Sequence, residues 1–309
     1  SRELVGRFIK SGYFEIVEYV HDEDRVRELV DRSQVQAVLR MNKGFGADLQ
    51  AGRTTQLQVI VDGTDSNTAR IVLDYSTRIA RQFSQEILGD AAQEPGRVEM
   101  QTRAWFNENL ESRNFYVPGV IAMIVMLVTL MLTSMAIVRE KEMGTMEQMM
   151  VTPITSTEFI LGKTLPFALI GFADVIMITL IGVFWFEVPI RGSLLLLFFA
   201  ATLYLMTTLG LGLLISTISQ TQQQAMLSTF LFFSPAVLLS GFIFPIANMP
   251  NVVQGITYLN PLRYFLVIIR GVFLKGVGLS ILWPQMVALV VLGITTLWLA
   301  SRRLQKTLA

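Results

Sequence analysis

The chain has 309 residues, a formal net charge of +1, a hydrophobic fraction of 52% and no cysteine. The balanced charge gives no reason to expect nucleic-acid binding, which calls for a basic patch or stripe. The lack of cysteine excludes disulfides, thiolate metal sites and a cysteine nucleophile. Its single histidine, His21, cannot form a histidine metal cluster alone, so we expect no metal site. A mean hydropathy of +0.51 is high for a soluble globular protein.

Residues 1–117 hold most of the charged side chains and alternate between strand-like and helix-like patterns. We expect strands over 14–20, 35–41, 56–61 and 98–106, and helices over 22–32 and 44–51. A turn at Asp62 and Gly63 leads into a further helix, capped by Thr64, Asp65 or Ser66. In that helix an apolar stripe recurs every four residues, formed by Ile71, Tyr75, Ile79, Phe83 and Ile87, and we expect it to pack on the sheet. The pattern predicts a compact α/β domain, and its polar residues form no catalytic or phosphate-binding motif.

Five apolar stretches follow, and each is long enough for a bilayer core, which needs about 20 helical residues. They cover residues 118–138, 165–186, 193–215, 225–244 and 281–300. An odd number of spans puts the two ends of the chain on opposite sides of the membrane. The basic residues of the short loops then favour a cytoplasmic C-terminus and an extracytoplasmic segment 1–117. Because Ser1 begins no signal peptide, we expect an additional N-terminal helix in the native protein, which makes six spans.

A short charged and methionine-rich segment, residues 139–150, follows the first of these spans and ends before Pro153. One interpretation is an interfacial helix that only connects two spans. The other is a docking element, since methionine surfaces suit adaptable protein contacts. The residues alone leave both open.

The second span carries an acid, Asp174, at roughly mid-bilayer depth. Ionisable residues inside a membrane are costly and usually functional, which makes Asp174 a candidate for a translocation path. A neutral Asp174 hydrogen-bonded to a neighbouring helix is the structural alternative.

The segment from Arg139 to Pro153 resembles the signature of the ABC-2 permease family, roughly R-E-[KR]-E-x-G-T-x-E-x-[LM]-x-V-[ST]-P. The matching residues are Glu140, Glu142, Gly144, Thr145, Glu147 and Pro153. Further matches lie at 44–45, 61–69, 117–119, 240–245, 248–250, 260–264 and 270–271, so the resemblance covers nearly the whole chain. One departure is residues 107–109, where such permeases often have Asn-Pro and this chain has Asn-Glu-Asn.

The resemblance implies an α-helical membrane domain over residues 118–309. An extracytoplasmic α/β domain, residues 1–117, is inserted between the first two of its six spans. It also implies a multi-pass permease subunit of an ATP-driven exporter in the bacterial inner membrane, for drug-like or amphiphilic compounds. Two permeases would pair, as identical copies or as paralogues. Whether a periplasmic adaptor also binds is left open.

The same resemblance assigns a coupling helix to residues 139–150, which would seat in a groove of a separate ABC ATPase subunit. Glu140, Glu142, Gly144, Thr145 and Glu147 would couple to that subunit. The chain has no phosphate-binding loop of the G-x-x-x-x-G-K-[ST] type, so we expect ATP and Mg²⁺ on the partner and no enzyme activity here.

The outer stretch 246–278 is broken by prolines and glycines. It is either an ordinary loop with an interfacial helix or, as the resemblance implies, a pair of re-entrant helices that form an outer gate and are buried in the dimer. The motif residues of this region are Pro245, Asn260, Pro261, Arg263, Tyr264 and Arg270.

Three other function classes compete with export. A membrane-embedded hydrolase would need clustered acids, histidines or a nucleophile, and Asp174 and His21 stand apart in the sequence. A secondary transporter would show internal repeats, which the chain lacks. A signalling or mechanical-coupling protein that uses the same ATPase without transport shares the coupling motif, and only a flux assay separates it from an exporter.

Overall fold

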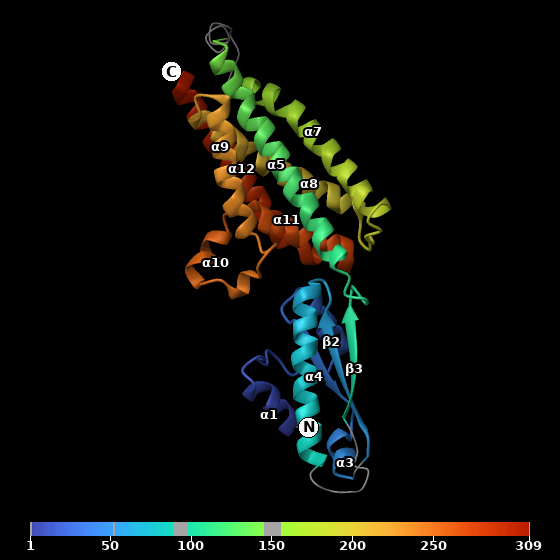
Figure 1. Ribbon diagram of the computed structural model, residues 1–309. Coiled ribbons are helices and arrows are strands. Elements are labelled where there is room, and N and C mark those ends of the chain that lie inside the picture. The colour runs from blue at the N-terminus through green and yellow to red at the C-terminus, as the bar shows by residue number, and fades with distance from the viewer. Residues whose placement is uncertain (1, 52, 89–97, 145–155, 309) are drawn as a thin grey trace. The chain divides into compact units, whose positions relative to one another are not determined.

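The computed structural model describes residues 2–51, 53–88, 98–144 and 156–308. The chain divides into two compact units, Ser1–Phe115 and Tyr116–Ala309. We call the first the α/β unit and the second the helical unit (Figure 1).

A three-stranded mixed sheet organises the α/β unit. In chain order its elements are α1 (Arg2–Lys10), α2 (Glu23–Asp31), β1 (Ala37–Met41), α3 (Phe45–Gln50), β2 (Thr55–Asp62), α4 (Ser66–Leu88) and β3 (Val98–Trp105). The strand order is β1-β2-β3, with β1 antiparallel and β3 parallel to β2. Parallel neighbours need a crossover connection, and α4 lies in it.

The core of the α/β unit lies between the sheet and its helices. Every second side chain of β2 points into it, so Leu57, Val59 and Val61 are fully buried. They meet Phe83 of α4 and Phe8 of α1 in one apolar cluster. Figure 1 shows α4 running along the sheet with α1 beside it.

One prediction for this unit is wrong and another is confirmed only in part. Residues 14–20 form no strand, and Val17 and Tyr19 are exposed, because β-rich residues need a neighbouring strand to pair with. The apolar stripe of α4 is also only partly buried: Ile79 and Phe83 are in the core, whereas Ile71 is 57% exposed. A strict four-residue spacing advances about 40° per step around a helix with 3.6 residues per turn, so the stripe leaves the buried face.

The N-terminal end of α4 confirms one of the three expected caps. The Asp65 side chain accepts hydrogen bonds from the backbone nitrogens of Asn67 at 3.0 Å and Thr68 at 3.3 Å. The expected helices over 22–32 and 44–51 and the strands near 35–41, 56–61 and 98–106 correspond to observed elements. No helix was expected over α1.

The regular elements described in the second unit are all helices, and the first of them begins at Ser112. The elements are α5 (Ser112–Glu142), α7 (Ser156–Phe184), α8 (Leu194–Ile218), α9 (Gln222–Leu238), the 3-10 turn η1 (Ile246–Asn248), α10 (Asn251–Thr257), α11 (Pro261–Arg270), the π turn η2 (Gly271–Lys275) and α12 (Leu279–Leu308). Within the described residues four helices are long and apolar enough to cross a membrane, namely α5, α7, α8 and α12. The segments 251–257 and 261–275 together pass the same test but are bent by 79°, as a broken span or a re-entrant loop would be.

The predicted span 225–244 differs from what is observed. Helix α9 ends at Leu238, and its 17 residues reach about 25 Å, short of a bilayer core of about 30 Å. Gly241 then adopts a left-handed φ of 83°, which stops the helix from continuing to residue 244.

The first predicted span is also longer than expected at both ends. Helix α5 begins at Ser112 and passes through Pro118 instead of starting there. It continues to Glu142, so Arg139–Glu142 form its last turn and not the start of a separate helix.

Helix α8 is the central helix of this unit and is held by close packing and buried hydroxyl bonds. The Thr129 hydroxyl of α5 donates to the Thr208 hydroxyl at 3.0 Å, and the Thr207 hydroxyl donates to the Leu289 carbonyl of α12 at 3.1 Å. The Tyr204 ring stacks on Phe265 of α11 with centroids 4.2 Å apart. Apolar burial supplies little attraction between helices in lipid, so such close contacts and hydrogen bonds carry the association.

Candidate functional site

The last turn of α5, Arg139–Glu142, is a charged turn whose side chains bind three other helices. Glu140 is its most buried member, with a side chain only 11% exposed, and it forms an ion pair with Lys163 of α7. Removing Lys163 would take the ion pair away from a largely buried carboxylate, which is strongly destabilising. The pair therefore fixes the end of α5 to α7.

The next two residues bind the two helix ends of the turn between α8 and α9. The Lys141 ammonium donates to carbonyl oxygens at the end of α8, at 3.2–3.4 Å (Ser216, Thr217 and Ser219). The Glu142 carboxylate accepts from the backbone nitrogen of Gln222 at 2.8 Å and from its side-chain amide at 2.5 Å, at the start of α9. A cation at a helix C-terminus and an anion at a helix N-terminus both match the helix dipoles.

The predicted coupling residues are only partly described. Gly144 lies two residues after the end of α5 with a left-handed φ of 71°, and a Cβ there would meet no atom within 4 Å. The backbone conformation, and not a lack of space, is therefore what favours glycine. Thr145 and Glu147 lie outside the described residues, as does Pro153.

In the outer motif, Asn260 joins two helices. It is 7% exposed, its amide donates to the Ala236 carbonyl at 2.6 Å near the end of α9, and its oxygen accepts from the Leu262 nitrogen at 3.1 Å. Asn260 is thus the N-cap of α11, with Pro261 at the favoured first helical position.

Arg263 and Tyr264 hold the bend between α10 and α11. The Arg263 guanidinium donates to the Thr257 hydroxyl and lies 4.1 Å from the Tyr258 ring centroid. The Tyr264 hydroxyl donates to the Tyr258 carbonyl at 2.8 Å. Both residues of the first turn of α11 therefore bind the end of α10.

Arg270 and Pro245 have different neighbours. The Arg270 guanidinium lies 5.8 Å from the Phe242 ring centroid, and that ring meets Tyr116 edge-on with centroids also 5.8 Å apart. Pro245 precedes the 3-10 turn η1 as its N-cap. The six motif residues are thus spread over several contacts, of which the Asn260–Tyr264 group is the most connected.

Asp174 lies on α7 between the buried residues Gly171 and Val175. Its Oδ2 atom is buried and has no hydrogen-bond partner among the residues that the structure describes. Asp174 lines none of the grooves described below.

Sequence reasoning missed an apolar groove between α5 and α9. It has a volume of about 410 Å³ and is lined on the α5 side by Met123, Ile124 and Leu127. Phe230 and Phe233 line the α9 side. Ser234 is the lone polar side chain among the described residues that line it, so the groove suits an apolar or amphiphilic molecule. The spans are apolar all round, so no sequence periodicity marks this face.

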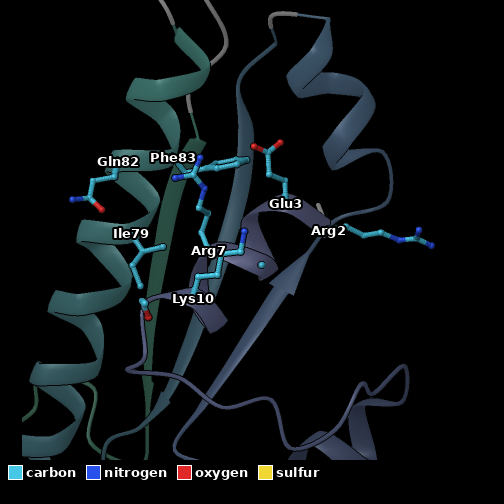
Figure 2. Close-up of a pocket in the computed structure, with 9 residues that line it drawn as sticks. Arg2, Glu3, Arg7, Lys10, Ile79, Gln82 and Phe83 are labelled. Atoms are coloured by element: carbon cyan, nitrogen blue, oxygen red, sulfur yellow. The ribbon is translucent and has the colours of Figure 1, made fainter.

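A second pocket, of about 830 Å³, lies in the α/β unit between α1 and α4 (Figure 2). Its floor includes the buried Ile79 and Phe83, and its rim carries charged residues. Arg7 on that rim is ion-paired with Glu86, and Arg2 points away from α4 in Figure 2. The described residues of this lining include no nucleophile paired with a base. Across the described ranges, no group of three or more His, Cys, Asp or Glu residues could hold a metal ion.

Comparison with known proteins gives one consistent result. The family model for ABC-2 family transporter proteins matches residues 1–302. The probable multidrug ABC transporter permease YbhR of Escherichia coli is 35% identical over 96% of this chain and 80% of that protein. The probable multidrug ABC transporter permease YbhS of the same species is 37% identical over 91% of this chain and 77% of that protein. The inner membrane transport permease YhhJ, also from Escherichia coli, is 30% identical over 90% of this chain and 75% of that protein.

Proposed function

This chain belongs to the ABC-2 transporter family, and on that premise we propose that it is the permease subunit of an ATP-driven exporter of drug-like or amphiphilic compounds. ATP and Mg²⁺ would bind to a separate ABC ATPase, and this chain would contribute no catalytic residue. Two relatives carry the words "probable multidrug ABC transporter permease" in their names, which supports the substrate class.

The charged turn is the observation that carries the proposal. Glu140, Lys141 and Glu142 are consecutive, and they bind α7, the end of α8 and the start of α9 respectively. A force applied by the ATPase to the segment that follows would therefore reach α7, α8 and α9 through one turn. Chains of hydrogen bonds and ion pairs of this kind can carry energetic coupling between distant sites.

We place the helical unit in the bacterial inner membrane as a multi-pass protein with a cytoplasmic C-terminus. The charged turn lies on the same side, together with the basic end of α12, where Arg302 and Arg303 lie. The α/β unit, which we expected over residues 1–117, would then be extracytoplasmic. The pocket between its α1 and α4 would offer a binding surface to a periplasmic adaptor.

The transport path would run along the groove between α5 and α9, facing a second copy of the chain or a paralogue. Its apolar walls fit the amphiphilic substrates proposed above. The bent pair of α10 and α11 would form the outer gate. Its backbone is irregular, yet Phe265 and Ile268 of α11 and Phe273 of η2 are fully buried against protein, which is the condition for such backbone at membrane depth.

The test compares the intact protein with a Glu142→Lys variant, which places a cation at the positive N-terminal end of α9. The full-length protein is purified in mild detergent, partner subunits are identified by mass spectrometry, and ATP hydrolysis and dye export from vesicles are measured. We expect an ATPase to co-purify with both proteins. The variant should lose most of the coupled hydrolysis and export.

Glu108→Lys is the matched control, because Glu108 is an exposed residue of the α/β unit and undergoes the same charge change. It should behave like the intact protein. Recovery of the intact protein without any ATPase, even after crosslinking, would contradict the proposal. Hydrolysis without flux of any amphiphile would favour a role in signalling or mechanical coupling.

A further inference from the structure

A third groove lies between α8, α9 and α12, at the end of the helical unit where Arg302 is found. Its volume is about 890 Å³. The walls are mostly apolar, with Leu211 and Leu214 from α8, Phe232 from α9 and Leu299 from α12. None of the functions proposed above uses it.

Two arginines and a tryptophan form one end of this groove. Arg302 and Arg303 line it, and the Arg302 guanidinium lies 4.1 Å from the centroid of the Trp298 ring. The apolar part of α12 that could span a membrane ends at Arg303. Tryptophan and arginine at the end of a span mark the boundary between hydrocarbon and water, so this end of the groove lies at headgroup level.

The charges of the lining select between lipid classes. Among the residues that the structure describes, the groove is lined by two cationic side chains and by no acidic one. An anionic headgroup gains charge-assisted hydrogen bonds with guanidinium groups, whereas a zwitterionic headgroup brings its own cation toward them. The apolar walls continue from the arginines toward the middle of α8 and α9, which suits acyl chains and not a free soluble anion.

We propose that this groove is a binding site for an anionic phospholipid such as phosphatidylglycerol. The phosphate binds Arg302 and Arg303, and the acyl chains lie along Leu211, Leu214 and Phe232. One lipid then contacts α8, α9 and α12 together and ties α9 to the other two helices. The proposal does not depend on the exported substrate or on the ATPase.

Trp298 provides a local probe, because brominated acyl chains quench tryptophan only at close range. The full-length protein is placed in lipid nanodiscs that contain brominated phosphatidylglycerol or brominated phosphatidylcholine at graded fractions. A Trp298→Phe variant is measured in parallel, and the difference isolates the signal of Trp298 from that of the other tryptophans. Soluble glycerol phosphate is added as a headgroup competitor.

We expect phosphatidylglycerol to bind near Trp298 roughly thirtyfold more tightly than phosphatidylcholine. Each of the two basic residues near an anionic lipid contributes about a fivefold factor in affinity. An Arg302→Gln, Arg303→Gln variant should reduce that preference to within about twofold. Arg191→Gln, which removes a charge from an exposed residue before α8, should leave it unchanged. Glycerol phosphate should not displace the lipid.

Equal quenching by the two lipids in the intact protein would overturn the proposal, as would an unchanged preference in the double arginine variant. No quenching by either lipid, together with a protein crosslinked at position 298, would show that a polypeptide occupies the groove instead. Elution at an unchanged volume in size-exclusion chromatography confirms that each variant is folded.

Discussion

At the scale of single residues, the outer motif is mainly a set of helix caps and clamps. Asn260 satisfies a carbonyl of α9 and a backbone nitrogen of α11 at once, and both atoms are buried with it. Arg263 is stacked and hydrogen-bonded within the same bend. These contacts give the motif residues a structural role, and that role does not require contact with a substrate.

We predict that Asn260→Ala lowers the stability of the protein by about 2 kcal/mol or more. A lost N-cap costs about 1 kcal/mol, and a buried carbonyl without a partner costs about 1–3 kcal/mol. The measurement is thermal unfolding in detergent followed by intrinsic fluorescence. Asn251→Ala is the matched control, because Asn251 begins α10 and is exposed. Equal thermal unfolding midpoints for the two variants would refute the capping role of Asn260.

At the scale of elements, close approach of α8 and α12 depends on glycines that face the partner helix. A Cβ on Gly293 would lie 2.7 Å from the Met206 side chain, and one on Gly210 would lie 3.0 Å from the backbone nitrogen of Leu297. The first neighbour is the flexible end of a methionine, whereas the second is backbone that cannot move alone. Gly210 is therefore the stricter position.

Gly210→Ala should cost about 1–3 kcal/mol, the usual penalty for forcing extra atoms into a packed interface. Gly162→Ala in α7 is the control, because a Cβ there would meet nothing within 4 Å. Chemical denaturation in detergent tests this prediction. The quantity compared is the free energy of unfolding of the two variants. A Gly210→Ala protein as stable as the control would show that α8 and α12 can separate without loss.

At the scale of the whole molecule, the two units have different physical bases. The α/β unit is stabilised by an apolar cluster shielded from water, with alternate residues of β2 pointing into it. The helical unit leaves large apolar side chains such as Leu195 and Phe184 about 80% exposed, which is stable only in contact with lipid or a partner chain.

The proposed orientation can be tested by labelling single introduced cysteines, because the chain has no cysteine of its own to give background labelling. Single variants His21→Cys, Ser193→Cys and Gln220→Cys report on the α/β unit, the turn before α8 and the turn before α9. A membrane-impermeant maleimide applied to intact spheroplasts should label the first two. It should label Gln220→Cys only after permeabilisation. Labelling of Gln220→Cys in intact spheroplasts would reverse the orientation.

Much of the fold could be predicted because the relevant signals are local. A run of apolar residues needs a helix in lipid whatever its neighbours are, so four of the five expected spans correspond to long apolar helices. Alternation and turn residues likewise located the strands that pair in the sheet. The local motif around residues 139–153 was sufficient to indicate the family, which the comparison confirms over residues 1–302.

The tertiary structure alone decided which groups meet. Glu142 reaches Gln222, 80 positions away, and Lys141 reaches carbonyls 75–78 positions away. Tertiary packing also decided that Ile71 of α4 faces outward and that α9 stops at Leu238. Apolar spans show no amphipathic pattern, so neither groove of the helical unit could be found from periodicity. The sequence determined what each segment is, since that depends on its own side chains, whereas its partners depend on packing over long separations along the chain.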